Sequence, residues 1–136
     1  MTQPTKEMLC QEAQRFFCLA ERDASAFRVL KDASDIHLST VCFHAQQAVE
    51  KYLKSVIIQQ GFELRKTHDL EAIYYILSEH GIVLPVGLEE LGKLNPYAVT
   101  FRYDDMDIEL LTRNEAENIM NTVRDWVENY LNKENY

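Results

Sequence analysis

The chain has 136 residues, and its 22 acidic and 14 basic side chains give a formal net charge of −8. This length fits one domain spanning residues 1–136, and 46% hydrophobic with 26% charged residues is the composition of an ordinary globular protein. Four Gly and three Pro are too few for the turns of a β-sandwich or barrel, so a helical protein is favoured. No apolar stretch approaches the roughly 18 residues of a membrane-spanning helix.

The first residues and the cysteines bear on cellular location. The opening MTQPTKEMLC carries Lys6 and Glu7 where a secretory signal has its apolar centre, which favours a cytoplasmic protein. Cys10, Cys18 and Cys42 are odd in number and lack a CxxC spacing. We therefore expect reduced, buried cysteines, and neither a disulfide framework nor a thiolate metal site.

Two long helices are predicted in the first half of the chain. Apolar residues recur at three- and four-residue intervals over 5–31, the spacing of one buried helical stripe. The polar run 32–35 interrupts this pattern, because its side chains compete with the helical backbone. A second helix is predicted over 36–60 and ends at Gly61, since glycine readily adopts the left-handed conformation found after helices. Its inner face is predicted to hold Cys42, Ala45, Val49, Leu53 and Val56.

A third helix and a short fourth one follow. The third opens at Thr67 or His68, with acidic residues in its first turn that suit the helix dipole, and ends at Gly81. A weaker apolar pattern starts at Pro85 and is ended by Pro96, so we expect a short helix there.

The last helix has the clearest start signal. We expect residues 97–111 to form a structured connection, partly helical at most, because no sustained period runs through them. Residues 112–115 (TRNE) form a capping box, in which hydroxyl and carboxylate satisfy each other's backbone donors. The fold class is therefore predicted to be an all-α, up-and-down bundle of four long helices plus one short helix.

Charge is spread unevenly along the chain. The overall acidity argues against a protein that coats DNA or RNA nonspecifically, because phosphate neutralisation needs clustered Lys and Arg. Residues 51–68 nevertheless carry a local balance of +3, whereas residues 101–136 carry −5. A compact basic region of this kind fits either a localised phosphate contact or a charged face for a partner.

The second predicted helix carries a polar stripe opposite its apolar face. His44, Gln47, Lys51 and Lys54 stand at i, i+3, i+7 and i+10, which places them along one line. Glu50 lies four residues before Lys54, the spacing of an exposed ion pair. Periodicity alone favours a solvated helix face, and the density of donor and acceptor groups leaves a binding face open.

Two stretches resemble the signatures of one family. Residues 42–70 (CFHAQQAVEKYLKSVIIQQGFELRKTHDL) resemble the central signature of the HEPN domain family, the higher eukaryotes and prokaryotes nucleotide-binding domain. Arg102 and Tyr103, after the short fourth helix, are similar to its later RY motif. The resemblance implies a helical bundle that pairs as a homodimer. It also implies a nucleotide- or RNA-associated module, often partnered with a minimal nucleotidyltransferase in a toxin–antitoxin-like pair.

Family members that are ribonucleases use an Arg followed, after four to six residues, by His. Those residues can supply a proton acceptor near neutral pH and a cation for the developing phosphorane charge. All four histidines of this chain precede Arg102, and no Arg is followed by His at that spacing. We therefore expect an interaction module rather than an enzyme. One alternative is a divergent, metal-independent endoribonuclease in which Arg102 is joined by His44 or His68. Another is a structural dimerisation domain without a ligand.

The resemblance and the basic region together give a set of candidate site residues. His68 is read either as a helix-capping residue or as a base, and Gln47 and Glu50 either as ligand contacts or as bridges that fix the loop at Arg102 and Tyr103. No metal or cofactor is predicted, because the acidic run 104–107 has no second ligand set beside it. The candidates for nucleotide or RNA binding are Gln47, Glu50, Lys51, Lys54, Arg65, Lys66, His68, Asp69, Arg102 and Tyr103.

Overall fold

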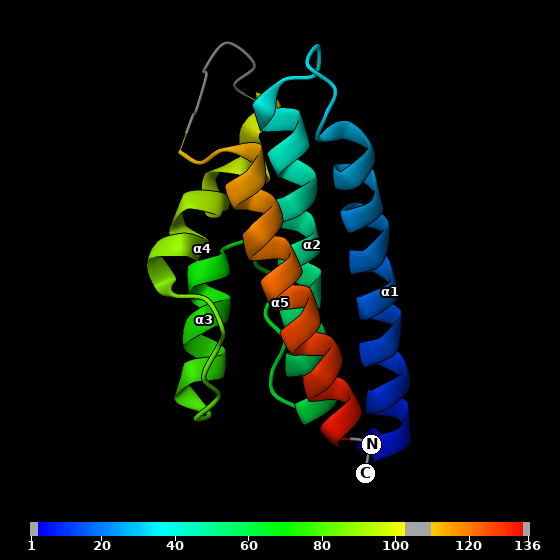
Figure 1. The fold of residues 1–136 in the computed structure, drawn as a ribbon. Helices are drawn as coiled ribbons and strands as arrows, with labels where there is room; N and C mark the ends of the chain where they lie inside the picture. Colours follow the sequence, from blue (N-terminus) through cyan, green and yellow to red (C-terminus); the bar gives the residue numbers. More distant parts are fainter. Residues whose placement is uncertain (1–2, 103–109, 135–136) are drawn as a thin grey trace.

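The computed structural model describes residues 3–102 and 110–134, and within these ranges it contains helices and connections but no strand. This described part of the chain holds five α-helices, and a 3₁₀ helix, η1, directly follows α4 (Figure 1). The all-α prediction is confirmed. The elements are α1 (Lys6–Leu30), α2 (Leu38–Gln60), α3 (Leu70–Glu79), α4 (Leu88–Leu94), η1 (Asn95–Arg102) and α5 (Arg113–Glu134).

Helix α2 is the central element of the bundle. α1 runs antiparallel beside it, α5 packs against it from another side, and η1 and α3 also contact it (Figure 1). Residues 61–69 return along the bundle after α2 ends, so α3 runs in the same direction as α2 (Figure 1). The path of residues 61–69 brings the start of α3 close to the middle of α2, which positions the site described below.

The apolar face of α2 forms the centre of the core. All five inner-face residues predicted from periodicity are fully buried, because a 3.6-residue repeat directs them to one side of the helix. Neighbouring elements also cover much of the opposite face of α2. As a result, polar residues of this helix are buried too: Gln46, Glu50, Lys54, Ser55 and Gln59.

Helix ends follow the local signals in the sequence. Gly61 ends α2 with φ of 74°, in the left-handed region that favours glycine. The capping box is confirmed: the Thr112 amide donates to Glu115 Oε1 at 2.9 Å, and the Glu115 amide donates to Thr112 Oγ1 at 3.1 Å. Helix α3 begins at Leu70, two or three residues later than predicted. Thr67 and Asp69 instead form side-chain turns, each accepting the amide two residues ahead at 3.0 Å.

Arg113, the first residue of α5, ties down the connection between α1 and α2. Its guanidinium donates to the carbonyl oxygens of Leu30, Lys31, Ala33 and Ile36 at distances of 2.5–3.2 Å. A single side chain thus binds four carbonyls of this connection, two of which, those of Leu30 and Ala33, also accept a backbone amide; its planar fork suits several acceptors at once. Sequence reasoning gave this arginine no role.

The cysteine prediction is correct in part. Cys42 is buried and Cys10 partly buried, but Cys18 is exposed on α1. None of the three forms a disulfide bond. Burial raises the pKa of Cys42 to about 12, so this side chain is a neutral core residue. Within the described ranges, none of the helices has both the length and the apolar character required to cross a membrane.

Candidate functional site

Glu50 is the centre of a buried polar cluster on α2. The residue is only 3% exposed, and its Oε2 accepts a hydrogen bond from Lys54 Nζ at 3.0 Å. Its Oε1 lies 3.0 Å from His68 Nδ1 and 3.4 Å from Gln46 Nε2. Three groups therefore meet one carboxylate that has almost no access to solvent, an arrangement that compensates the cost of burying its charge.

Glutamine side chains extend this cluster to the backbone before α3. Gln46 Nε2 donates to the carbonyl oxygen of His68 at 3.0 Å, and Gln47 Nε2 donates to Gln46 Oε1 at 2.7 Å. Both the ring and the backbone of His68 are thus held by α2. We call the set Gln46, Gln47, Glu50, Lys54 and His68 the Glu50 cluster.

His68 connects the Glu50 cluster to a surface groove. Its side chain is 71% exposed although Nδ1 contacts Glu50, so the edge of the ring that carries Nε2 is open. The groove has a volume of about 460 Å³ and lies between the start of α3 and the junction of α4 with η1. We call it the α3–α4 groove; it is lined by Thr67, His68, Asp69, Glu71, Gly92, Asn95, Pro96 and Ala98.

Asn95 joins the two sides of the α3–α4 groove. Its Nδ2 donates to Asp69 Oδ1 at 2.8 Å, and its Oδ1 accepts the Leu70 amide at 2.8 Å. Asp69 Oδ1 also accepts the amide of Glu71 at 3.0 Å. These bonds satisfy the first amides of α3 and fix the groove's rim, so the groove is already formed in the structure.

The predicted polar stripe does not act as one set. Lys51 Nζ binds Asp23 of α1 at 2.6 Å, and His44 Nδ1 lies 3.4 Å from the same carboxylate. Lys54 belongs to the Glu50 cluster and is only 8% exposed. The interpretation of the stripe as a solvated face is therefore wrong for Lys54. Each of the two lysines already has a carboxylate partner, so neither presents an uncompensated charge to a phosphate.

Arg65 and Lys66 are placed differently from the stripe lysines. Both are exposed in the 61–69 connection, immediately before Thr67 at the edge of the α3–α4 groove. Neither makes a side-chain hydrogen bond or ion pair within the described part of the chain. These two cations are available to a ligand.

The remaining candidates lie at the edge of what the structure describes. Arg102 is the last residue of η1, and its side chain lies outside the described residues, as does the whole of Tyr103. The acidic run 104–107 lies outside them as well. The hypothesis that Arg102 and Tyr103 converge with the residues of α2 stays a prediction. Among the described residues, no group of His, Cys, Asp and Glu could hold a metal ion.

Several members of the site were missed from the sequence; the two that hold it together by hydrogen bonds are Gln46 and Asn95. Gln46 stands four residues before Glu50, a helical spacing at which side chains can meet, so the signal was available. Asn95 bonds residues 25 and 26 positions earlier, and no local pattern reports such a long-range contact.

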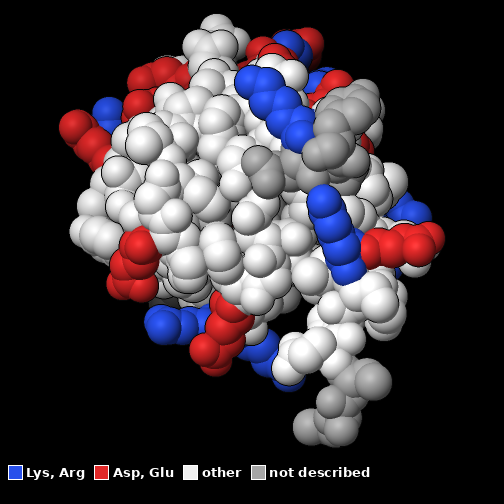
Figure 2. Space-filling model, turned by 90° about the horizontal axis from the view of Figure 1, so that it is seen from below, with Lys and Arg blue, Asp and Glu red and all other residues white. Residues whose placement is uncertain are grey.

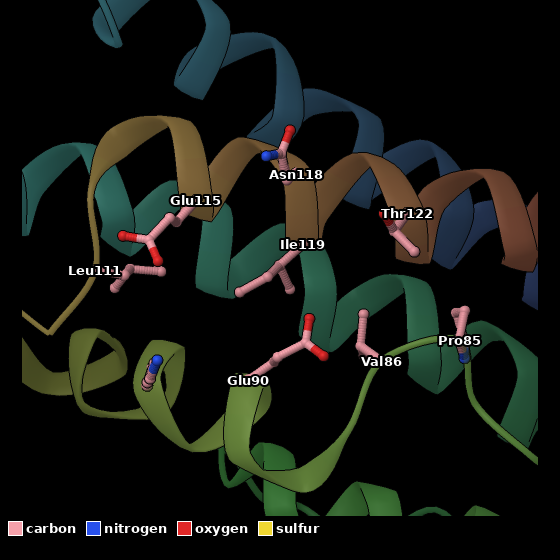
Figure 3. Close-up of a pocket in the computed structure, with 9 residues that line it drawn as sticks. Pro85, Val86, Glu90, Leu111, Glu115, Asn118, Ile119 and Thr122 are labelled. Carbon is pink, nitrogen blue, oxygen red and sulfur yellow. The ribbon is translucent and has the colours of Figure 1, made fainter.

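A second groove, which we call the α4–α5 groove, separates α4 from α5 (Figure 3). It has a volume of about 330 Å³, and Val86 and Ile119 point toward each other across it (Figure 3). Glu90 and Glu115 line it, yet each uses one oxygen to accept a backbone amide at its own helix start. None of the predicted site residues lines this groove.

Charged residues elsewhere serve packing between helices. Glu21 of α1 accepts hydrogen bonds from Tyr52 Oη at 2.8 Å and from Arg124 Nε at 2.7 Å, which joins α1, α2 and α5. Burial, followed by the bond to Glu21, raises the pKa of Tyr52 above its ordinary value. The end of the bundle where α1 begins has a broad uncharged surface, and its Lys and Arg are scattered singly (Figure 2).

Comparison with known proteins supports the resemblance seen in the sequence. The family model described as the HEPN domain matches residues 7–133. The crystal structure of ST0689, an archaeal HEPN homologue, has a similar fold, with a TM-score of 0.58 and 22% sequence identity over 88% of this chain and 97% of that chain. No curated protein matches the sequence.

Proposed function

Because the chain belongs to the HEPN domain family, we propose that it is a nucleotide- or RNA-associated interaction module whose ligand binds in the α3–α4 groove. The observation that carries this proposal is the position of His68. A buried carboxylate holds Nδ1 of its ring, while the side chain is 71% exposed and the residue lines a preformed groove. Recognition sites are characteristically concave and contain a few well-fixed polar groups.

Electrostatics favour one orientation of a nucleotide. The lining of the groove contains the carboxylates of Asp69 and Glu71 and no Lys or Arg. A phosphate within it would be repelled, whereas a base and a sugar would find hydrogen-bond partners. The uncompensated charges of Arg65 and Lys66 stand just outside the groove, where they can receive phosphates. We therefore infer that base and ribose enter the groove and that the phosphates lie against residues 65–66.

Binding of a fluorescently labelled, single-stranded RNA of mixed sequence tests this proposal by anisotropy. We expect Arg65→Ala and Lys66→Ala each to weaken binding and to reduce the dependence of affinity on salt by about one counterion. His68→Ala should weaken binding with the salt dependence unchanged. The matched controls are Arg22→Ala, an exposed arginine of α1, and His80→Ala at the far end of α3. If the variants and the controls lose RNA affinity to the same extent, the proposal is contradicted.

The partner and the oligomeric state belong to the same proposal. Family membership supports a homodimer that pairs with a minimal nucleotidyltransferase in a toxin–antitoxin-like pair. Co-expression with the product of the neighbouring reading frame, followed by affinity capture and light scattering, tests both points. A monomer that captures no such partner would contradict both the homodimer and the partnership. A dimer that binds neither a partner nor a ligand would indicate a structural dimerisation domain instead.

A second candidate function is a divergent, metal-independent endoribonuclease. The contact between Glu50 and His68 favours it, because a carboxylate that orients an imidazole is the arrangement used by general bases. Incubation of total RNA in the presence of a chelator, with wild type, His68→Ala and Arg102→Ala, tests it. Cleavage that both substitutions abolish would establish this function. Cleavage that survives them would come from a contaminant.

A further inference from the structure

The protonation of the His68 ring can be read from its surroundings. Glu50 receives Lys54 Nζ on Oε2 and Gln46 Nε2 on Oε1. Ammonium and amide NH₂ groups only donate hydrogen bonds, so both oxygens of Glu50 act as acceptors, and the Lys54 ammonium at 3.0 Å favours the ionised carboxylate. An ionised carboxylate has no proton to give to His68 Nδ1, which lies 3.0 Å away. The proton in that contact therefore belongs to the imidazole, and Nδ1 is the protonated nitrogen.

A neutral imidazole carries a single N–H, and the state of one nitrogen fixes that of the other. With Nδ1 protonated, Nε2 is an acceptor. Gln46 reinforces this orientation, because its bond to the His68 carbonyl holds the backbone from which the ring projects. The exposed part of the ring therefore carries a lone pair, and His68 lines the α3–α4 groove.

The charged groups that line the groove are hydrogen-bond acceptors as well. The carboxylates of Asp69 and Glu71 stand beside His68, and no cationic side chain lines the groove. A ligand that fits such a lining must supply hydrogen-bond donors. In a nucleotide, the donors that accompany every base are the hydroxyls of ribose, and the 2′-hydroxyl is the one that DNA lacks.

We propose that Glu50 is a positioning residue that holds His68 with an unprotonated Nε2 facing the α3–α4 groove, and that this nitrogen accepts a hydrogen bond from a ribose 2′-hydroxyl of the ligand. The statement about the ligand rests on the proposed function. The statement about Glu50 and His68 concerns the free protein and can be tested without any ligand.

Nitrogen-15 NMR of the histidine rings in the free protein, at mildly alkaline pH, tests the positioning role. We expect wild-type His68 to show a protonated Nδ1 and an unprotonated Nε2. Glu50→Gln should give a mixture of both tautomers, and Lys51→Met, a control outside the Glu50 cluster, should leave His68 unchanged. If Glu50→Gln does not fold, the wild-type spectrum alone decides: a protonated Nε2 with a bare Nδ1 would overturn the inference.

The hydroxyl contact is tested with two RNAs of the same sequence, one of them carrying 2′-fluoro in place of every 2′-hydroxyl. Fluorine removes the donor with little change in size. We expect wild type to bind the fluoro RNA about fivefold more weakly, the loss of one hydrogen bond, and His68→Ala to bind both equally. Equal affinity of wild type for both would overturn the hydroxyl contact alone. Failure to bind either would contradict the proposed function, with the NMR result still deciding the role of Glu50.

Discussion

Lys54 Nζ lies 3.0 Å from Glu50 Oε2, and neither side chain has more than about a tenth of its surface exposed. Their spacing in the sequence is that of an ordinary surface ion pair, but their burial changes the energetics. Taking two charges out of water is costly, and mutual attraction offsets the cost only while both partners remain.

Removal of one partner should therefore be far more damaging than removal of a surface pair. We expect Lys54→Met to lower the free energy of unfolding by about 3 kcal/mol, since it leaves the Glu50 carboxylate buried and uncompensated. Lys51→Met, whose partner Asp23 lies in a partly exposed position, should cost no more than about 1 kcal/mol. Urea denaturation measures both, and similar losses would show that the Glu50 cluster is solvated.

Arg113 should be among the most sensitive positions outside the core. Its guanidinium holds four carbonyl oxygens of the connection between α1 and α2. We expect Arg113→Ala to lower stability by about 3 kcal/mol, and Arg113→Lys to recover only part of that, because an ammonium lacks the planar fork. The exposed Arg22 provides the control. A loss equal to that of Arg22→Ala in urea denaturation would contradict this role.

Cys18 and Cys42 should differ in their reactivity, and Cys42 should make stability depend on pH. Cys18 is exposed and should react with iodoacetamide in the native protein, whereas buried Cys42 should react only after unfolding. The pKa of Cys42 is raised from 9.0 to about 12. Its contribution to stability is thus complete below pH 9 and is lost as the pH rises toward 12. We expect Cys42→Ala to reduce the alkaline loss of stability; an unchanged alkaline slope would argue against this pKa.

Glu115, at the start of α5, should make stability fall at acid pH, whereas Cys42 makes it fall at alkaline pH. Hydrogen bonds from the backbone and side chain of Thr112 lower the pKa of Glu115 below its ordinary value of 4.5. The carboxylate therefore contributes stability above that pH, and the contribution is lost as the pH falls through the lowered pKa. Glu115→Gln should flatten the acid side of the stability curve. Thr112→Ala should cost about 1 kcal/mol at neutral pH. An acid limb identical to wild type in Glu115→Gln would contradict the capping role.

Local patterns were sufficient to predict the helices and much of the core. The spacing of Cys42, Ala45 and Val49 follows from helix geometry, and the capping box at 112–115 depends on residues three apart. The family resemblance at residues 42–70 pointed to the region that contains the Glu50 cluster. These signals lie within a few residues of one another, where sequence reasoning is strongest.

Long-range packing accounts for what the sequence did not reveal. Some partners come from elsewhere in the chain: Asp23 binds Lys51 of the polar stripe from 28 residues away, and Asn95 binds the start of α3 from 25 residues away. Helical periodicity separates two faces of α2, but it cannot show that neighbouring elements bury parts of both. The exposure of Cys18 likewise depends on which faces of α1 are left uncovered.

We propose above all that the α3–α4 groove and the adjoining residues 65–66 bind RNA. Backbone amide NMR during titration with a short single-stranded RNA tests that claim most directly. We expect the amide resonances of residues 65–71, 92–95 and 97–98 to shift, and those of Glu90, Glu115 and Asn118 at the α4–α5 groove to stay in place. Shifts confined to the α4–α5 groove, or no shifts at all, would contradict it.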